Sequence, residues 1–145
     1  MASFLIHEIA HKFSAQHYGL RAEFRLTLMG SLLTLFSIFF SFFKIIAPGA
    51  VMMAGAISKE KAGKTALAGP LTNITLSITF IGITMIVQSP IADLGAWINA
   101  FIALFNLVPF GIMDGWKVFR WNKALWTSSF ISSIILAVFC FSYIL

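Results

Sequence analysis

Two histidines near the start of the chain are spaced to bind one metal ion. Residues 7 to 11 read His-Glu-Ile-Ala-His. On a helix, residues four apart lie about 40° apart around the axis, so His7 and His11 can face the same ion. Glu8 projects close to the same side and can take a proton from a metal-bound water. The pattern is typical of zinc-dependent hydrolases; the alternative is a polar stripe on a helix that binds no metal.

The composition is that of an integral membrane protein. Of the 145 residues, 59% are hydrophobic and 10% are charged, and the mean hydropathy is +0.93, far above that of soluble domains. A membrane span needs about 20 residues, so the length allows a single domain, residues 1–145, with four or five apolar segments. Ionisable side chains are costly in lipid, which favours a functional role for the histidine motif. The single Cys140 excludes a disulfide framework.

Helix breakers divide the chain into five apolar segments. Gly19 can end the first segment, which carries the motif; Ser89 and Pro90 can begin the fourth; Pro109 and Gly111 interrupt regular helix before Asp114. Residues 48–55 are short and apolar between glycines and could be a strand or a loop. The five segments are residues 3–17, 26–46, 66–87, 90–108, and 123 or 124 to 145.

The positive charges predict how these segments cross the membrane. All ten Lys and Arg fall on one side if every segment except 26–46 crosses, and that side should be cytoplasmic. We therefore expect an all-α integral membrane fold: a bundle of about four transmembrane helices plus one re-entrant or in-plane segment, with a short β element on the cytoplasmic side if residues 48–55 form a strand. The same topology brings Asp114 to the side of His7 and His11, where it can be a third ligand.

Three sequence elements follow one another along the chain. They are the histidine motif at 7–11, Ala-Gly-Pro-Leu-Thr-Asn at 68–73, and Asn-Leu-Val-Pro-Phe-Gly-Ile-Met-Asp-Gly at 106–115. Together they resemble the site-2 protease family of intramembrane zinc metalloproteases over about residues 3–120; the first and third elements in combination are highly specific, whereas the middle one alone is weak. The resemblance implies that His7, His11 and Asp114 bind one zinc ion per chain and that Glu8 is the general base.

The resemblance also implies a role for Asn73, as a contact to the substrate backbone or to the developing oxyanion. The residues themselves leave open an interhelical hydrogen bond from a polar face of segment 66–87. Further positions would support the site: a helix break before Asp114 lets the aspartate turn toward the metal, and a glycine after it permits close backbone approach. These expected supporting residues are Gly69, Pro70, Asn106, Pro109 and Gly115.

The chain departs from the family pattern in two respects. Many relatives carry proline at the position of Ile112, and glycine or arginine at that of Trp116. Only six residues precede His7, about 9 Å of helix, whereas relatives have a longer helix and usually another span before it. We therefore expect either a truncated reading frame or a minimal core of the family.

The expected function is hydrolysis of a peptide bond within the bilayer, in a transmembrane segment of another membrane protein. The protein would lie in the cell membrane as a multi-pass protein with its basic loops and site opening on the cytoplasmic side, and residues 51–57 could pair with the substrate as an added strand. Two alternatives remain: a catalytically inactive membrane scaffold of the same fold, and a metal-transporting membrane protein. No motif supports nucleic-acid binding, and the sequence specifies neither the substrate nor the oligomeric state.

Overall fold

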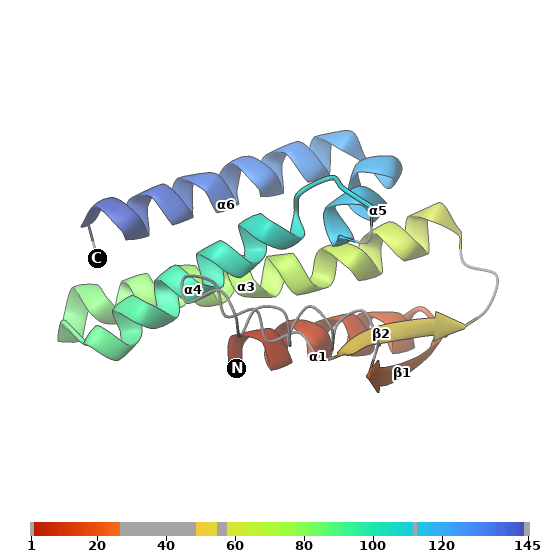
Figure 1. Cartoon of the computed structure of the whole chain (residues 1–145), viewed down its shortest axis with the longest axis horizontal. Coiled ribbons are helices and arrows are strands. Elements are labelled where there is room, and N and C mark those ends of the chain that lie inside the picture. Colours follow the sequence, from red (N-terminus) through yellow and green to blue (C-terminus); the bar gives the residue numbers. More distant parts are fainter. Residues whose placement is uncertain (1, 27–48, 55–57, 112, 144–145) are drawn as a thin grey trace, which may run out of the picture.

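The computed structural model describes residues 2–26, 49–54, 58–111 and 113–143 (Figure 1). Residues 27–46 of the segment expected to re-enter the membrane lie outside this part of the chain. Within the described part there are five helices and one pair of strands. Their bounds are α1 Ala2–His17, β1 Arg21–Leu26, β2 Gly49–Ala54, α3 Lys59–Val87, α4 Pro90–Asn106, α5 Asp114–Trp121 and α6 Lys123–Tyr143.

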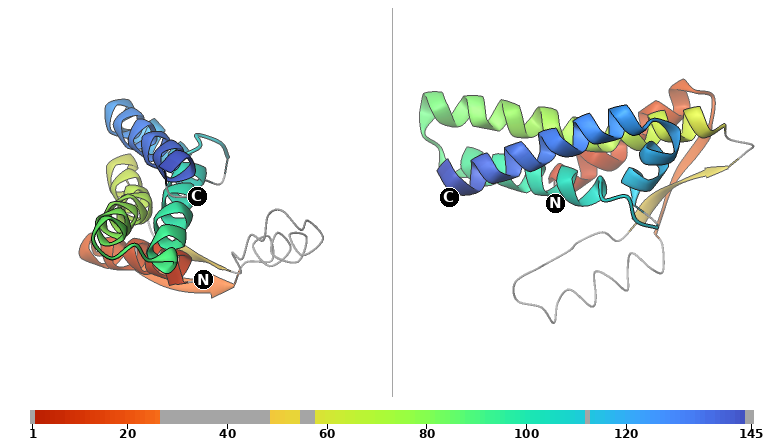
Figure 2. Two further views of the ribbon diagram at one scale, coloured as in Figure 1. Left: turned by 90° about the vertical axis from the view of Figure 1, so that its left-hand side faces the viewer. Right: turned by 90° about the horizontal axis from the view of Figure 1, so that it is seen from above.

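Helix α3 is the centre of the bundle, because it packs against α1, α4, α5 and α6. Seen from the side and along the bundle, α1 and α6 lie on opposite sides of the α3–α4 pair (Figures 1 and 2). The end of α1, the start of α3, the end of α4, all of α5 and the start of α6 gather at one end of the molecule (Figure 1). The turn between α3 and α4 lies at the other end. This arrangement brings the motif helix and Asp114 together.

The start of α3 corrects one expected boundary. The helix begins at Lys59 rather than near residue 66, because Ser58 caps a polar first turn and its Oγ accepts a hydrogen bond from the Lys61 backbone N–H at 3.2 Å. It ends at Val87, and the next residue, Gln88, adopts the left-handed conformation of a C-terminal cap. The next helix begins at Pro90, as expected, although Ser89 makes no side-chain capping bond there.

Residues 49–54 form a strand, which settles the choice between strand and loop. β2 pairs antiparallel with β1, so that Arg21 lies opposite Ala54 and Leu26 opposite Gly49. β1 was not predicted, although its polar and apolar residues alternate as strand residues do. The two-stranded sheet lies against α1.

Helix α5 was also not predicted. It has only eight residues and follows the break after α4, so its periodic signal is short. Gly115 and Val118, three residues apart, are buried on one face of α5. Its first residue is Asp114, so the helix fixes where that carboxylate points.

Two described helices are long and apolar enough to cross a membrane, Lys59–Val87 and Lys123–Ser142. Only 22% and 17% of their most apolar windows are buried, unlike the core helices of a soluble protein. Large apolar side chains elsewhere are also open to the surroundings, including Ile91 at 82% exposure. These features indicate a membrane protein. The expectation of about four crossing helices stays a prediction for α1 and for α4, which has 17 residues.

Candidate metal centre

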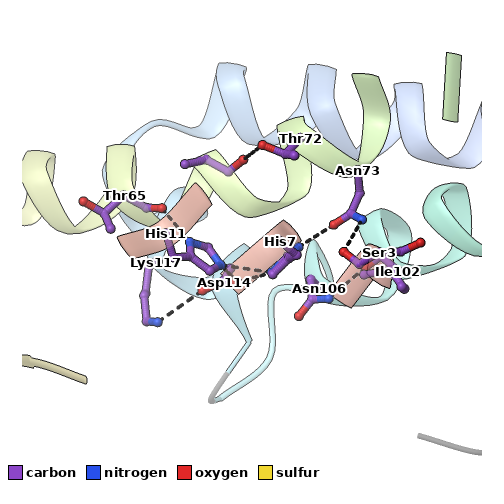
Figure 3. A network of polar contacts seen from close by, with 11 residues as sticks. Ser3, His7, His11, Thr65, Thr72, Asn73, Ile102, Asn106, Asp114 and Lys117 are labelled. Atoms are coloured by element: carbon purple, nitrogen blue, oxygen red, sulfur yellow. Dashed lines mark hydrogen bonds and ion pairs between the residues drawn. The ribbon is translucent and has the colours of Figure 1, made fainter. Parts of the chain in front are cut away.

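Three potential metal ligands converge from two helices (Figure 3). His7 and His11 lie on α1, and Asp114 is the first residue of α5. The two Nε2 atoms are 3.0 Å apart, and Asp114 Oδ2 lies 2.9 Å from His11 Nε2 and 3.4 Å from His7 Nε2. Both histidines are buried, and the Asp114 side chain is 13% exposed. The ligand-bearing atoms therefore surround one point in the protein.

The hydrogen bonds of the two Nδ1 atoms determine the tautomer of each ring, and with it the state of the Nε2 atom that faces this point. His11 Nδ1 lies 2.8 Å from the Thr65 carbonyl oxygen, which can only accept, so Nδ1 donates. His7 Nδ1 lies 2.5 Å from Asn73 Oδ1, another acceptor. In each neutral ring the Nε2 atom then carries a lone pair instead of a proton. This is the tautomer that a metal-binding histidine needs.

The donor set fits a metal ion. Two nitrogen lone pairs and a carboxylate oxygen repel one another at such short distances unless a proton or a metal cation lies among them. A tetrahedral zinc site with bonds of about 2.0–2.2 Å places its ligand atoms roughly 3.3–3.6 Å apart. The observed distances of 2.9, 3.0 and 3.4 Å are slightly shorter, so the three side chains need to separate by only a few tenths of an ångström. Gly69 leaves the necessary room, because a Cβ atom there would lie 2.5 Å from His11 Nε2 and 2.6 Å from His7 Nε2. Three protein ligands leave a fourth position for water.

Asp114 is held as a carboxylate by its surroundings. Its Oδ1 atom accepts a hydrogen bond from Lys117 Nζ at 3.2 Å, which leaves Oδ2 facing the two imidazoles. Burial alone would raise the pKa of Asp114, but attraction to the protonated form of His11 and, more weakly, to Lys117 holds that pKa well below its usual range. A bound cation would exert the same attraction on the carboxylate in place of the His11 Nε2 proton. An ionised carboxylate is the form that binds a metal.

Glu8, the expected general base, lies directly after His7 on α1. It is buried, with 8% of its surface exposed. A carboxylate withdrawn from solvent beside two candidate metal ligands is a candidate for proton transfer, because burying an ionisable group costs free energy and such groups are concentrated at functional sites.

The turn between α4 and α5 directs Asp114 toward the histidines. α4 ends at Asn106, two residues before the predicted end near Val108, and the Asn106 amide donates to the Ile102 carbonyl of the same helix at 2.9 Å. A Cβ atom on Gly115 would collide with the backbone carbonyl groups of Leu107 and Val108, so the chain folds back tightly here. Trp126 of α6 donates from Nε1 to the Leu107 carbonyl at 2.8 Å. Pro109 lies in this turn, and Pro70 is buried within α3.

Several contacts around the ligands were missed by sequence reasoning. The spacing of Lys117 from Asp114, three residues on a helix, could have indicated their pairing. Thr65 contributes a backbone carbonyl, for which no side-chain signal exists. Asn99 of α4 contacts Asn73 of α3, a pairing that depends on how the two helices pack. The interhelical hydrogen bond left open for Asn73 is therefore present.

The chain is similar to two curated proteins. It is 38% identical over 132 residues to "Putative zinc metalloprotease MJ0611" of Methanocaldococcus jannaschii, a match that covers 86% of this chain and 69% of that protein. It is 32% identical over 129 residues to "Putative zinc metalloprotease Rip3" of Mycobacterium tuberculosis, covering 83% of this chain and 28% of that protein. No family model and no solved structure matches the chain.

Proposed function

Because the chain belongs to the site-2 protease family, peptidase family M50, we propose that it is an intramembrane zinc metalloendopeptidase. Its substrates would be transmembrane segments of other membrane proteins. The names of its relatives support a metalloprotease function in general terms. The observation that carries the proposal for this chain is the convergence of His7, His11 and Asp114 within 3.4 Å of one another, with room beside Gly69 for an ion.

The residues would divide the chemistry among them. His7, His11 and Asp114 would hold one zinc ion, which when bound polarises the scissile carbonyl and lowers the pKa of a coordinated water toward about 7. Glu8 accepts a proton from the attacking water and returns it to the amine that leaves. Burial of Glu8 keeps bulk water from competing for that proton.

A substrate helix must present extended backbone to be cleaved. We propose that the two-stranded sheet of β1 and β2 holds the substrate in that extended form. β2 pairs with β1 on one side, and the other edge of a two-stranded sheet can accept a further strand. The stretch 51–57, expected to pair with substrate, overlaps β2 over residues 51–54. The two-stranded sheet lies against α1, the helix that carries Glu8.

The orientation in the membrane is part of the proposal. Lys and Arg residues occur on the ends of helices that gather beside α5 (Figure 1), among them Lys59 at the start of α3 and Lys123 at the start of α6. By the excess of positive charge in cytoplasmic loops, this end faces the cytoplasm. Water would then reach the site from that side.

The test is cleavage of a model transmembrane substrate by the purified protein with and without Glu8→Gln. We expect the wild type to bind one zinc ion and cleave, and Glu8→Gln to bind zinc equally while cleavage falls by at least about 10³-fold, as loss of a general base allows. Undiminished cleavage by Glu8→Gln would refute the mechanism. Zinc binding without cleavage by the wild type would favour a scaffold, and zinc flux into vesicles would favour a transporter.

A further inference from the structure

Asn73 of α3 contacts His7 and Ser3 of α1 beside the candidate metal centre (Figure 3), and it also contacts Asn99 of α4. It lies on α3 and is fully buried; its Oδ1 lies 2.5 Å from His7 Nδ1 on α1. Its Nδ2 lies 2.8 Å from Asn99 Oδ1 on α4 and 3.3 Å from the Ser3 carbonyl oxygen on α1. A carbonyl oxygen can only accept, so the amide nitrogen must face Ser3. The amide oxygen is thereby turned toward His7.

The orientation of the Asn99 amide follows from the same argument. Its Nδ2 donates to the Gly95 carbonyl oxygen at 2.8 Å and to Ser3 Oγ at 3.1 Å. The Gly95 oxygen cannot donate, so Asn99 must present its own Oδ1 to Asn73. Both amide orientations are therefore set by backbone carbonyl groups.

The hydrogen bonds consequently run in one direction. His7 Nδ1 donates to Asn73, Asn73 donates to Asn99, and Asn99 donates to the backbone of α4. A reversed chain would need a carbonyl oxygen that donates, which is chemically impossible. Since both amides are fully buried, no water competes for these bonds, and an unsatisfied member would cost free energy.

We propose that Asn73 and Asn99 are positioning residues for His7. Together they hold its ring in the Nδ1–H tautomer and aim Nε2 at the zinc ion. The proposal rests on the metal site of the proposed function and assigns Asn73 a role different from the substrate contact implied by the family resemblance. It also gives Asn99, which no motif singles out, a part in metal binding.

A purely structural role, in which the amides only join α3 to α4, is the competing explanation. The chain offers a matched control for it. Ser77 lies one helical turn beyond Asn73, is also fully buried, and donates from Oγ to the Ala96 carbonyl of α4 at 2.9 Å. Ser77→Ala therefore removes a buried bond between the same two helices without touching the chain of bonds to His7.

The experiment measures the zinc dissociation constant of the full chain in detergent, by competition with a chromophoric chelator. We expect Asn73→Ala to weaken zinc binding by about 10–100-fold, the usual effect of losing the partner of a metal-bound histidine. Asn73→Asp keeps an acceptor for His7 Nδ1, and its protonated form can still donate to Asn99, so it should bind zinc more tightly than Asn73→Ala. Asn99→Ala should lie between Asn73→Ala and wild type, and Ser77→Ala should stay within about twofold. The visible absorption of the Co²⁺-substituted protein should change in Asn73→Ala and not in Ser77→Ala.

The outcomes separate this inference from the proposed function. If wild type binds zinc and Asn73→Ala binds it as tightly, with an unchanged Co²⁺ spectrum, the positioning role is wrong even if cleavage falls. If Asn73→Ala does not fold, Asn99→Ala decides: zinc affinity equal to that of Ser77→Ala overturns the inference. If wild type binds no zinc, the proposed function itself fails.

Discussion

Lys117 Nζ donates to Oδ1 of Asp114 at 3.2 Å, while the other oxygen of the same carboxylate faces the histidines. The two residues are three apart on α5, so the helix itself brings the lysine to the carboxylate. The lysine thus occupies one carboxylate oxygen and leaves the second for an ion. The contribution of this pair to zinc affinity can be measured.

Lys117→Met should change zinc affinity only modestly. The Lys117 side chain is 41% exposed, and exposed ion pairs contribute about 0–1 kcal/mol, so we expect a loss of at most about fivefold. Asp114→Asn, which weakens the ligand itself, should lose far more. Competition with a chelator measures both; a loss of more than about tenfold in Lys117→Met would mean that the lysine contributes more than such a pair can.

Gly69→Ala should abolish zinc binding. The added Cβ would lie within 2.6 Å of both Nε2 atoms, so the imidazoles must move out of the positions in which they face Asp114. Gly82→Ala on the same helix is the control, because nothing lies within 4 Å of a Cβ there. Alanine is the better helix former by about 1 kcal/mol, so Gly82→Ala should keep its zinc and gain slight thermal stability. Metal analysis and thermal unfolding provide the readouts, and stoichiometric zinc in Gly69→Ala would contradict the placement of the ion.

Removal of zinc should destabilise the protein. A ligand at about 1,000 times its dissociation constant stabilises the folded state by about 4 kcal/mol, so a strong chelator should lower the unfolding temperature of the wild type by several degrees. His11→Ala already lacks a ligand, and its unfolding temperature should not respond to the chelator. An equal response of the two proteins would show that the chelator acts elsewhere.

Gly115→Ala should disturb the turn that carries Asp114. The added Cβ would meet backbone carbonyl groups of Leu107 and Val108, which cannot rotate away as a side chain can. We expect loss of roughly 2 kcal/mol or more of stability together with weaker zinc binding. Gly111→Ala, in a left-handed conformation with open space around it, should lose about 1 kcal/mol and keep its zinc. Equal effects of the two substitutions would argue against close packing at Gly115.

Cysteine labelling should reveal the orientation of the bundle. In a Cys140→Ser background, Lys59→Cys and Lys123→Cys should react with an impermeant maleimide from the cytoplasmic side. Ile91→Cys, at the opposite end of the bundle and on a side chain that is 82% exposed, should react from the other side. Labelling of all three from one side would end the proposed topology.

The sequence predicted those features that depend on short-range spacing. The four-residue interval between His7 and His11 places both rings on one face of any helix, and Pro90 marked the start of α4 correctly. Asp114 could be placed beside the histidines because the number of helices between them determines the end of the bundle at which it lies.

Features that depend on packing or on weak local signals were missed. The polar turn at Ser58 extends α3 beyond its apolar run, although a capping serine could have indicated this. β1 alternates in polarity but needed β2, which follows long after it in the chain, to become a strand. Asn99 could not be connected to His7 from sequence, since their link passes through Asn73 on a third helix.

The third candidate ligand, Asp114, lies more than 100 residues after the two histidines in the sequence, and this separation has a consequence for biosynthesis. The imidazoles of α1 leave the ribosome first, and the carboxylate at the start of α5 is made only after α3 and α4. A nascent chain therefore has no complete set of the three candidate ligands until the start of α5 has been translated. If the chain is the protease proposed above, it would be unable to cleave neighbouring membrane proteins before that point.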